Sequence, residues 1–128
     1  MGCRSGWFLG IHLRKVYERY HLPILVTENG IGAPDILEAD GKIHDAYRIQ
    51  FIREHLQQMR LAITDGVQIL GYCPWAAIDV VSTHQGYRKR YGFIYVDREE
   101  FDLKELKRFR KDSFYWYANV ILENGQNL

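Results

Sequence analysis

The segment Ile24-Leu25-Val26-Thr27-Glu28-Asn29-Gly30 places a carboxylate at the end of a short apolar run. Aliphatic residues between Pro23 and Asn29-Gly30 predict a buried strand that ends at Glu28. We expect both faces of this strand to be covered, as in a parallel sheet. In α/β barrels and open sheets, side chains at the carboxyl ends of strands carry the chemistry. Glu28 is therefore a candidate nucleophile, general base or metal ligand, or equally a structural ion-pair partner.

A second group of polar side chains follows a later apolar run that ends at Trp75. Its loop contains three consecutive cations, Arg88-Lys89-Arg90, between Tyr87 and Tyr91. Lysine supplies a point charge, arginine a bidentate contact and hydroxyls hydrogen bonds, which together suit an anion. The pattern alone favours a solvated basic loop, with the anion site as the alternative. One basic tripeptide in a chain of net charge +1 is too little for nucleic-acid binding.

A βαβ unit must position these groups. We expect a helix over 9–21 with Leu9, Leu13, Val16 and Tyr20 inward, and a second strand over 67–75. Between the strands, a long helix over 44–64 carries an apolar stripe of Ile49, Ile52, Leu56, Met59 and Ile63. Asp45 suits the dipole at the start of this helix. A helical crossover makes the two strands parallel, so Glu28 and the residues after Trp75 should meet at one pocket.

The C-terminal third of the chain predicts a hairpin and a closing helix. Residues 93–96 form one short strand, and residues 106–110 pair with it. Asp112 or Ser113 caps the last helix, whose inward residues are Phe114, Tyr117, Val120 and Ile121. Residues 1–6 carry no periodic signal and remain unassigned.

Composition indicates one soluble globular domain. The chain has 128 residues, of which 47% are hydrophobic and 26% charged. No apolar run approaches the roughly 20 residues of a membrane span, so we expect no membrane partner. The first residues lack the order of a signal peptide, and Cys3 and Cys73 form no metal or redox motif. Both observations favour a reducing cytoplasm with free thiols.

Four ordered segments resemble the C-terminal part of family-one glycoside hydrolases. They are Thr27-Glu28-Asn29-Gly30, Tyr72-Cys73-Pro74-Trp75-Ala76-Ala77-Ile78-Asp79, Lys89-Arg90-Tyr91-Gly92-Phe93-Ile94-Tyr95-Val96-Asp97 and Lys111-Asp112-Ser113-Phe114-Tyr115-Trp116-Tyr117. The resemblance implies an α/β fold: the seventh and eighth strands of a (β/α)8 TIM barrel, with helices and a short β-hairpin. Residues 1–128 would then form a single partial domain, because such a barrel takes about 250 residues.

The resemblance also implies a mechanism. Glu28 matches the catalytic nucleophile of a retaining glycosidase, which needs a second carboxylate about 5–5.5 Å away. The family carries that acid/base in an Asn-Glu-Pro motif, which does not occur in this sequence. We therefore expect the 128-residue chain to be inactive alone. The resemblance implies no metal and no organic cofactor.

The second loop resembles the 6-phospho-β-glycosidase branch of that family. Ser82 stands where plain β-glucosidases have a glutamate, and Ser82, Lys89 and Tyr91 match the phosphate clamp. Thr83 is similar to the gluco-specific branch, and Trp75 resembles the indole platform beneath the sugar. The implied partner is a phosphorylated β-glucoside in the cytoplasm. Because a partial barrel exposes strand edges, we also expect the chain to self-associate, either as an inactive fragment or as a non-catalytic sugar-phosphate-binding module.

Overall fold

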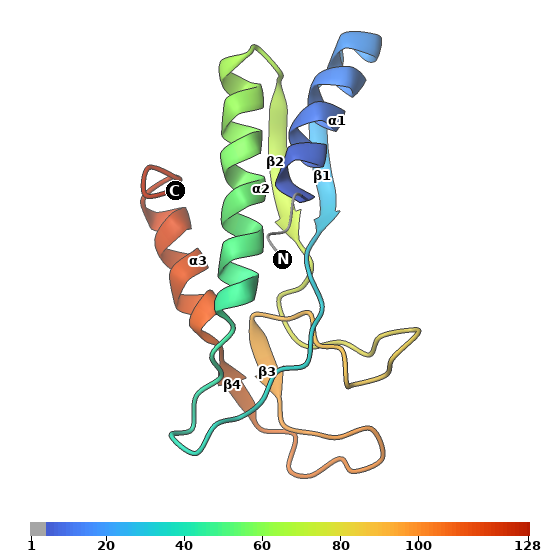
Figure 1. The fold of residues 1–128 in the computed structure, drawn as a ribbon, viewed down its shortest axis with the longest axis vertical. Helices are drawn as coiled ribbons and strands as arrows, with labels where there is room; N and C mark the ends of the chain where they lie inside the picture. The colour runs from blue at the N-terminus through green and yellow to red at the C-terminus, as the bar shows by residue number, and fades with distance from the viewer. Residues whose placement is uncertain (1–4) are drawn as a thin grey trace.

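The computed structural model describes residues 5–128, and its elements divide into two halves (Figure 1). One half holds two long helices beside a pair of strands, and the other holds long loops around a short hairpin. The elements are α1 (Ser5–Tyr20), β1 (Ile24–Asn29), α2 (Ala46–Thr64), β2 (Ile69–Pro74), β3 (Ile94–Val96), β4 (Arg108–Arg110) and α3 (Asp112–Leu122). The predicted order of helices and strands is confirmed. Helix α1 includes two residues of the segment left unassigned, and Cys3 lies outside the described residues.

Strands β1 and β2 pair in parallel and are joined through α2, as predicted for a βαβ unit. The register places Ile24 opposite Ile69 and Asn29 opposite Pro74, so the carboxyl ends of both strands lie at the same edge. Helices α1 and α2 pack on this pair through a buried cluster whose members are Leu13, Ala62 and Val67.

The opposite face of the strand pair is open within the described residues. Leu25 is 49% exposed and Leu70 is 72% exposed. The expectation that both faces are covered is therefore wrong for this chain. Successive strand residues point to opposite faces, and helices cover only one of them here.

A second apolar cluster joins α2, α3 and the start of β3. Its buried members are Ile52, Leu56, Phe93 and Val120. The predicted helix faces are confirmed at their centres and wrong at their ends. The exposed members are Val16 and Tyr20 in α1, Ile63 in α2 and Ile121 in α3. Tyr17, one residue away from Val16, packs in the cluster instead, because the buried stripe of α1 repeats every four residues.

The hairpin of β3 and β4 is antiparallel, as predicted. The cap of α3 differs from the prediction, because Lys111 rather than Asp112 or Ser113 occupies the N-cap position. Asp45 does occupy the N-cap of α2, but it makes no side-chain capping bond. Cys73 is a free and exposed thiol. Across residues 5–128, no helix combines the length and apolar character needed to cross a membrane.

Candidate active site

Glu28 lies at the carboxyl end of β1, where its side chain is exposed. The residue after it, Asn29, is fixed from β2. Tyr72 Oη donates a hydrogen bond to Asn29 Oδ1 at 2.6 Å, and the Trp75 N–H donates to the Asn29 carbonyl at 2.8 Å. Burial raises the pKa of Tyr72, which keeps its phenol protonated as a donor. These contacts hold the end of β1 against the end of β2.

The turn after Glu28 requires glycine at position 30. A Cβ atom on Gly30 would lie 1.9 Å from the carbonyl oxygen of Trp75. Any larger residue would push the two chain segments apart, because real Cβ atoms do not approach oxygen so closely. Gly30 therefore allows the turn after Glu28 to lie in direct contact with the Trp75 segment, which carries a cis Trp75–Ala76 peptide bond.

A cleft of about 440 Å³ opens at this edge of the strand pair. Four of the predicted site residues line it: Glu28, Trp75, Ser82 and Tyr91. Thr83 and the Val80–Val81 segment complete the wall beside Asn29 and Gly30. The Trp75 side chain is 42% exposed, so part of its indole is accessible to a ligand. The prediction that the two strand ends share one pocket is confirmed.

Two members of the predicted phosphate clamp, Ser82 and Lys89, lie beside the phenol of the third member, Tyr91. Hydrogen bonding with Ser82, then with Lys89, together with the Lys89 charge, lowers the pKa of Tyr91, while the charge of Glu28 opposes this shift. The Lys89 Nζ lies 5.4 Å from the centre of the Tyr91 ring. Lys89 is not among the residues that line the cleft, but its ammonium lies beside the ring of Tyr91, which does line it. The arrangement offers two hydroxyls and a cation to an anionic group.

The three consecutive cations do not act as one group. Arg90 is buried, with its guanidinium 3.1 Å from Asp79 Oδ2 and 2.8 Å from the Val96 carbonyl. Arg88 is exposed and does not line the cleft. The interpretation of the tripeptide as a single anion site is therefore wrong. Arg90 forms a structural ion pair with Asp79, and of the three cations only Lys89 stands beside the cleft.

Six buried charged side chains form a connected cluster that the sequence analysis missed. They are Asp35, Asp45, Arg48, Asp79, Arg90 and Lys111, hereafter the ionic cluster. Lys111 Nζ lies 2.6 Å from Asp35 Oδ2 and 2.7 Å from Asp79 Oδ1, and Arg48 lies 2.7 Å from Asp35 and 2.8 Å from Asp45. Three carboxylates balance three cations. Among the described residues, no buried side-chain nitrogen or oxygen lacks a hydrogen-bond partner.

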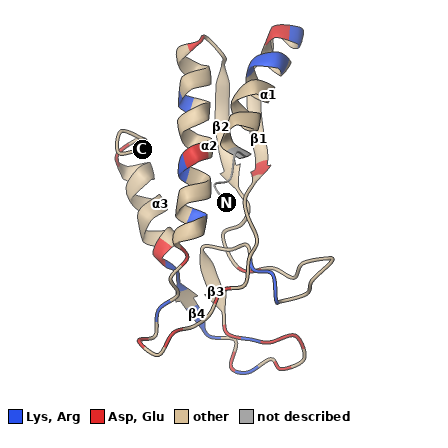
Figure 2. Ribbon diagram, in the orientation of Figure 1, with Lys and Arg blue, Asp and Glu red and all other residues tan. Residues whose placement is uncertain are grey.

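The ionic cluster holds the loops that surround the cleft. Asp79 accepts a hydrogen bond from the Gly92 N–H at 2.9 Å, and so fixes the segment after Tyr91. Asp45 accepts bonds from the Ser113 N–H at 2.9 Å and from Ser113 Oγ at 2.5 Å, which ties α2 to α3. Figure 2 shows acidic and basic residues interspersed along the loops beyond the strand ends.

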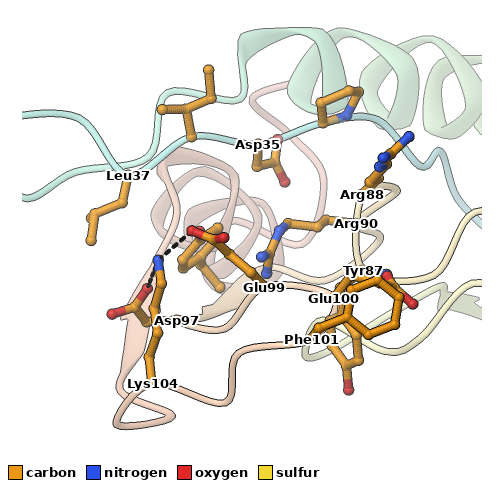
Figure 3. A pocket seen from close by; sticks show the side chains of 13 residues that line it. Asp35, Leu37, Tyr87, Arg88, Arg90, Asp97, Glu99, Glu100, Phe101 and Lys104 are labelled. Atoms are coloured by element: carbon orange, nitrogen blue, oxygen red, sulfur yellow. Dashed lines mark hydrogen bonds and ion pairs between the residues drawn. The ribbon is translucent and has the colours of Figure 1, made fainter.

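A larger hollow of about 790 Å³ lies between the loop before α2 and the hairpin (Figure 3). Asp35 and Arg90 of the ionic cluster reach its wall, and at its rim Lys104 pairs with Asp97 at 3.4 Å and Glu99 at 3.0 Å. None of the predicted site residues lines this hollow. Four of the predicted site residues therefore meet at the smaller cleft and none at the larger hollow. The described residues also hold no group of three His, Cys, Asp or Glu placed to bind a metal.

Residues 4–126 match the profile of the family described as glycosyl hydrolase family 1. The chain belongs to glycosyl hydrolase family 1. Its relatives include the aryl-phospho-β-D-glucosidase BglC of Bacillus subtilis, which is 52% identical over 120 residues. The phospho-cellobiase of Klebsiella oxytoca is 50% identical over 117 residues, and the 6-phospho-β-glucosidase AscB of Escherichia coli is 46% identical over 121 residues.

This family 1 chain spans about a quarter of the length of those relatives. The BglC match covers 94% of this chain and 25% of the relative, the phospho-cellobiase match 91% and 25%, and the AscB match 94% and 26%. The family 1 β-glucosidase of Thermotoga maritima in complex with isofagomine lactam superposes with a TM-score of 0.87 at 38% identity. That match covers 94% of this chain and 27% of the other. The predicted fold class, part of a (β/α)8 barrel, is confirmed.

Proposed function

We propose that this chain supplies the nucleophile and the phosphate-binding side of a 6-phospho-β-glucosidase. The observation that carries the proposal is the shared cleft, which Glu28, Ser82 and Tyr91 line together, with the Lys89 ammonium 5.4 Å from the centre of the Tyr91 ring. The relatives named aryl-phospho-β-D-glucosidase BglC and phospho-cellobiase, which are 52% and 50% identical to this chain, support the same substrate class. The substrate is a β-glucoside phosphorylated at position 6.

The phosphate side discriminates by charge. A glutamate at position 82 would repel a phosphate, whereas the hydroxyl of Ser82 donates a hydrogen bond to it. Lys89 supplies the positive charge and Tyr91 a second hydroxyl. Trp75, partly exposed at the cleft, stacks beneath the sugar ring. Thr83 favours a glucoside over a galactoside. Because phosphorylated disaccharides arise inside cells after coupled import, we place the enzyme in the cytoplasm.

The catalytic step is a double displacement with retention. Glu28 attacks the anomeric carbon and forms a glycosyl ester while the aglycone oxygen departs, and water then cleaves the ester. Departure of an ordinary aglycone requires a proton from a second carboxylate. Residues 1–128 contain no Asn-Glu-Pro motif, so we propose that another part of the barrel supplies this carboxylate. We therefore expect no turnover by residues 1–128 alone.

Titration calorimetry with glucose 6-phosphate tests the phosphate side. We expect the chain to bind glucose 6-phosphate at least about tenfold more tightly than glucose, the gain that each 1.4 kcal/mol of charge-assisted bonding gives. Ser82→Ala and Lys89→Met should each remove most of this preference. Arg88→Met is the matched control, because it removes one positive charge from the same loop outside the cleft.

Two results would contradict the phosphate assignment: equal affinity for glucose and glucose 6-phosphate, or an equal loss in the Arg88→Met and Lys89→Met variants. A separate assay with a chromogenic 6-phospho-β-glucoside tests the inactivity of the chain alone. We expect no release of the chromophore by steady-state turnover. Turnover that disappears in Glu28→Gln would show that the second carboxylate is dispensable and would overturn that part of the proposal.

A second candidate function is non-catalytic self-association. It is favoured by the exposed Leu25 and Leu70 on the open face and by the two outer edges of the β1–β2 pair, which no other described strand covers. Light scattering over a range of concentrations tests it. We expect oligomers that dissociate in Leu70→Lys. A monodisperse monomer at all concentrations would reject this candidate.

A further inference from the structure

The guanidinium of Arg48 bridges the two loops that border the cleft. Its Nη1 atom donates to the Ile31 carbonyl at 2.6 Å and to the Tyr91 carbonyl at 3.0 Å. Ile31 belongs to the turn that follows Glu28, and Tyr91 belongs to the phosphate clamp. One nitrogen atom thus links the segment after Glu28 to the segment that carries Tyr91.

Arg48 is itself held rigidly within the ionic cluster. It is only 1% exposed, and its Nε and Nη2 atoms pair with Asp45 and Asp35. The Nη2 atom also donates hydrogen bonds to the Tyr47 hydroxyl oxygen at 2.6 Å and to the Arg90 carbonyl at 3.3 Å. The five N–H groups of this planar fork reach six acceptors because the two N–H groups of Nη2 are shared among three of them, an arrangement that a lysine ammonium with three donors cannot reproduce.

The backbone around this bridge joins the same segments. Ala33 and Arg90 exchange both N–H to carbonyl bonds, at 3.1 and 2.9 Å. The Tyr91 carbonyl also accepts a bond from the Ala76 N–H at 3.1 Å. The segments after β1, after β2 and before β3 therefore converge on the carbonyl that Arg48 binds. A small displacement of the guanidinium changes the position of Tyr91 relative to Glu28.

We propose that Arg48 is a positioning residue that sets the span between the phosphate clamp and Glu28. This inference rests on the proposed function, because it assumes that one ligand contacts both sides of the cleft. Arg48 touches no ligand and acts through the carbonyls of Ile31 and Tyr91. Its removal should impair ligands that span the cleft more than ligands that occupy only the clamp.

Two probes of different length separate this role from general stabilisation. Inorganic phosphate needs only Ser82, Lys89 and Tyr91, whereas glucose 6-phosphate must also fit against Trp75 and Glu28. For Arg48→Lys we expect at least about tenfold weaker binding of glucose 6-phosphate, with binding of phosphate changed by less than about threefold. Arg53→Lys on the same helix, where Arg53 stacks on Trp116 at 5.2 Å, is the matched control and should change neither.

Circular dichroism first establishes that Arg48→Lys is folded. If it is not, Arg48→Ala is refolded in millimolar guanidinium chloride, which can take the place of the missing side chain between Asp35 and Asp45, with ammonium chloride as the control salt. We expect guanidinium, and not ammonium, to restore the affinity for glucose 6-phosphate. Equal losses for both probes, or recovery with both salts, would overturn the positioning role. If the wild-type chain itself prefers neither probe over glucose, the proposed function fails, and the positioning role falls with it.

Discussion

The apolar clusters of the helix and strand half differ from the ionic cluster of the loop half in the interactions that hold them together. Ile52, Leu56 and Val120 pack on α2 and α3 at helical spacing, and their contacts have no preferred direction. Arg48 and Lys111 bind acceptors at fixed distances and angles, in a region with little regular secondary structure. Both regions are buried, yet only the second determines where individual backbone carbonyls lie.

The two kinds of interaction hold different parts of the cleft. The strand ends bring Glu28 and Trp75 together through the parallel pairing of β1 and β2, which apolar packing is sufficient to maintain. Ser82 and Tyr91 lie outside the helices and strands, where isolated backbone bonds with Gly86 and Ala76 hold them. Near Tyr91, directional contacts from Arg48 and Asp79 of the ionic cluster add to these bonds. The same contacts are costly to leave half made, since a buried charge without its partner is strongly unfavourable.

The largest expected effect is the loss of stability on breaking the ionic cluster. Lys111→Met leaves Asp35 and Asp79 buried without the cation that lies between them. We expect the free energy of unfolding to fall by about 3–5 kcal/mol, measured by urea denaturation. Lys107→Met is the control, because its ion pair with Glu105 is exposed to solvent and should contribute little to the free energy of unfolding. Equal effects of the two substitutions would contradict the difference between the two regions.

The apolar core should respond with a smaller or equal loss. Ile52 is 2% exposed, and Ile52→Ala removes buried surface and leaves a cavity, which typically costs about 2–5 kcal/mol. Ile63→Ala, on the same predicted stripe but exposed, should cost under about 1 kcal/mol. In the folded protein, Ile52→Ala should leave the ratio of the affinity for glucose 6-phosphate to the affinity for phosphate unchanged. Lys111→Met should change this ratio. A changed ratio would mean that the apolar core also positions the loops.

The two regions also differ in what the sequence could predict. The stripe of α2 repeats at three and four residues, so local periodicity indicates its buried face. The partners of Lys111 lie 76 and 32 residues away in the chain, and no periodic signal links them. Asp45 illustrates the limit. Its place at the start of α2 was predictable, whereas its contact with Ser113, which lies 68 residues away, was not.

The sequence could predict those residues of the candidate site that stand at the ends of strands. Glu28 and Trp75 follow apolar runs, and their meeting follows from the parallel pairing. The place of Ser82, Lys89 and Tyr91 came from a resemblance rather than from a local rule. Arg88-Lys89-Arg90 shows why: three adjacent cations look equivalent in sequence, but only burial reveals that Arg90 serves Asp79 and that Lys89 stands beside Tyr91.

A moderate effect is expected in the pH dependence of phosphate binding. Ser82 and Lys89 lower the pKa of Tyr91 from its ordinary value of 10.0. Protonated Tyr91 donates to a phosphate, whereas the phenolate repels it, so affinity for glucose 6-phosphate should decline as the pH rises through the lowered pKa of Tyr91, before ordinary tyrosines ionise. Tyr91→Phe should bind several-fold more weakly at neutral pH and show less decline. Parallel profiles for the two proteins would contradict a role for the phenol.

The smallest effect should come from an exposed ion pair at the border of the two regions. His44 Nδ1 lies 2.6 Å from Asp112 Oδ2, and Asp40 lies 3.4 Å from Nε2. The hydrogen bond with Asp112, and more weakly that with Asp40, raises the pKa of His44 above 6.5. Because the protonated form is the one stabilised, this contribution is complete below pH 6.5 and is lost as pH rises through the raised pKa.

His44→Gln should therefore lower the Tm slightly at pH 5.5 and leave it unchanged at pH 8.5, as thermal denaturation at the two pH values would measure. Asp112→Asn removes the stronger partner and should give the same pattern. The pair is exposed to solvent and screened by salt, so added sodium chloride should reduce the difference at pH 5.5. The effect of Lys111→Met should survive the same salt, because its partners are buried. Equal salt sensitivity of both variants would place the ionic cluster in contact with solvent and remove the distinction between the two kinds of ion pair.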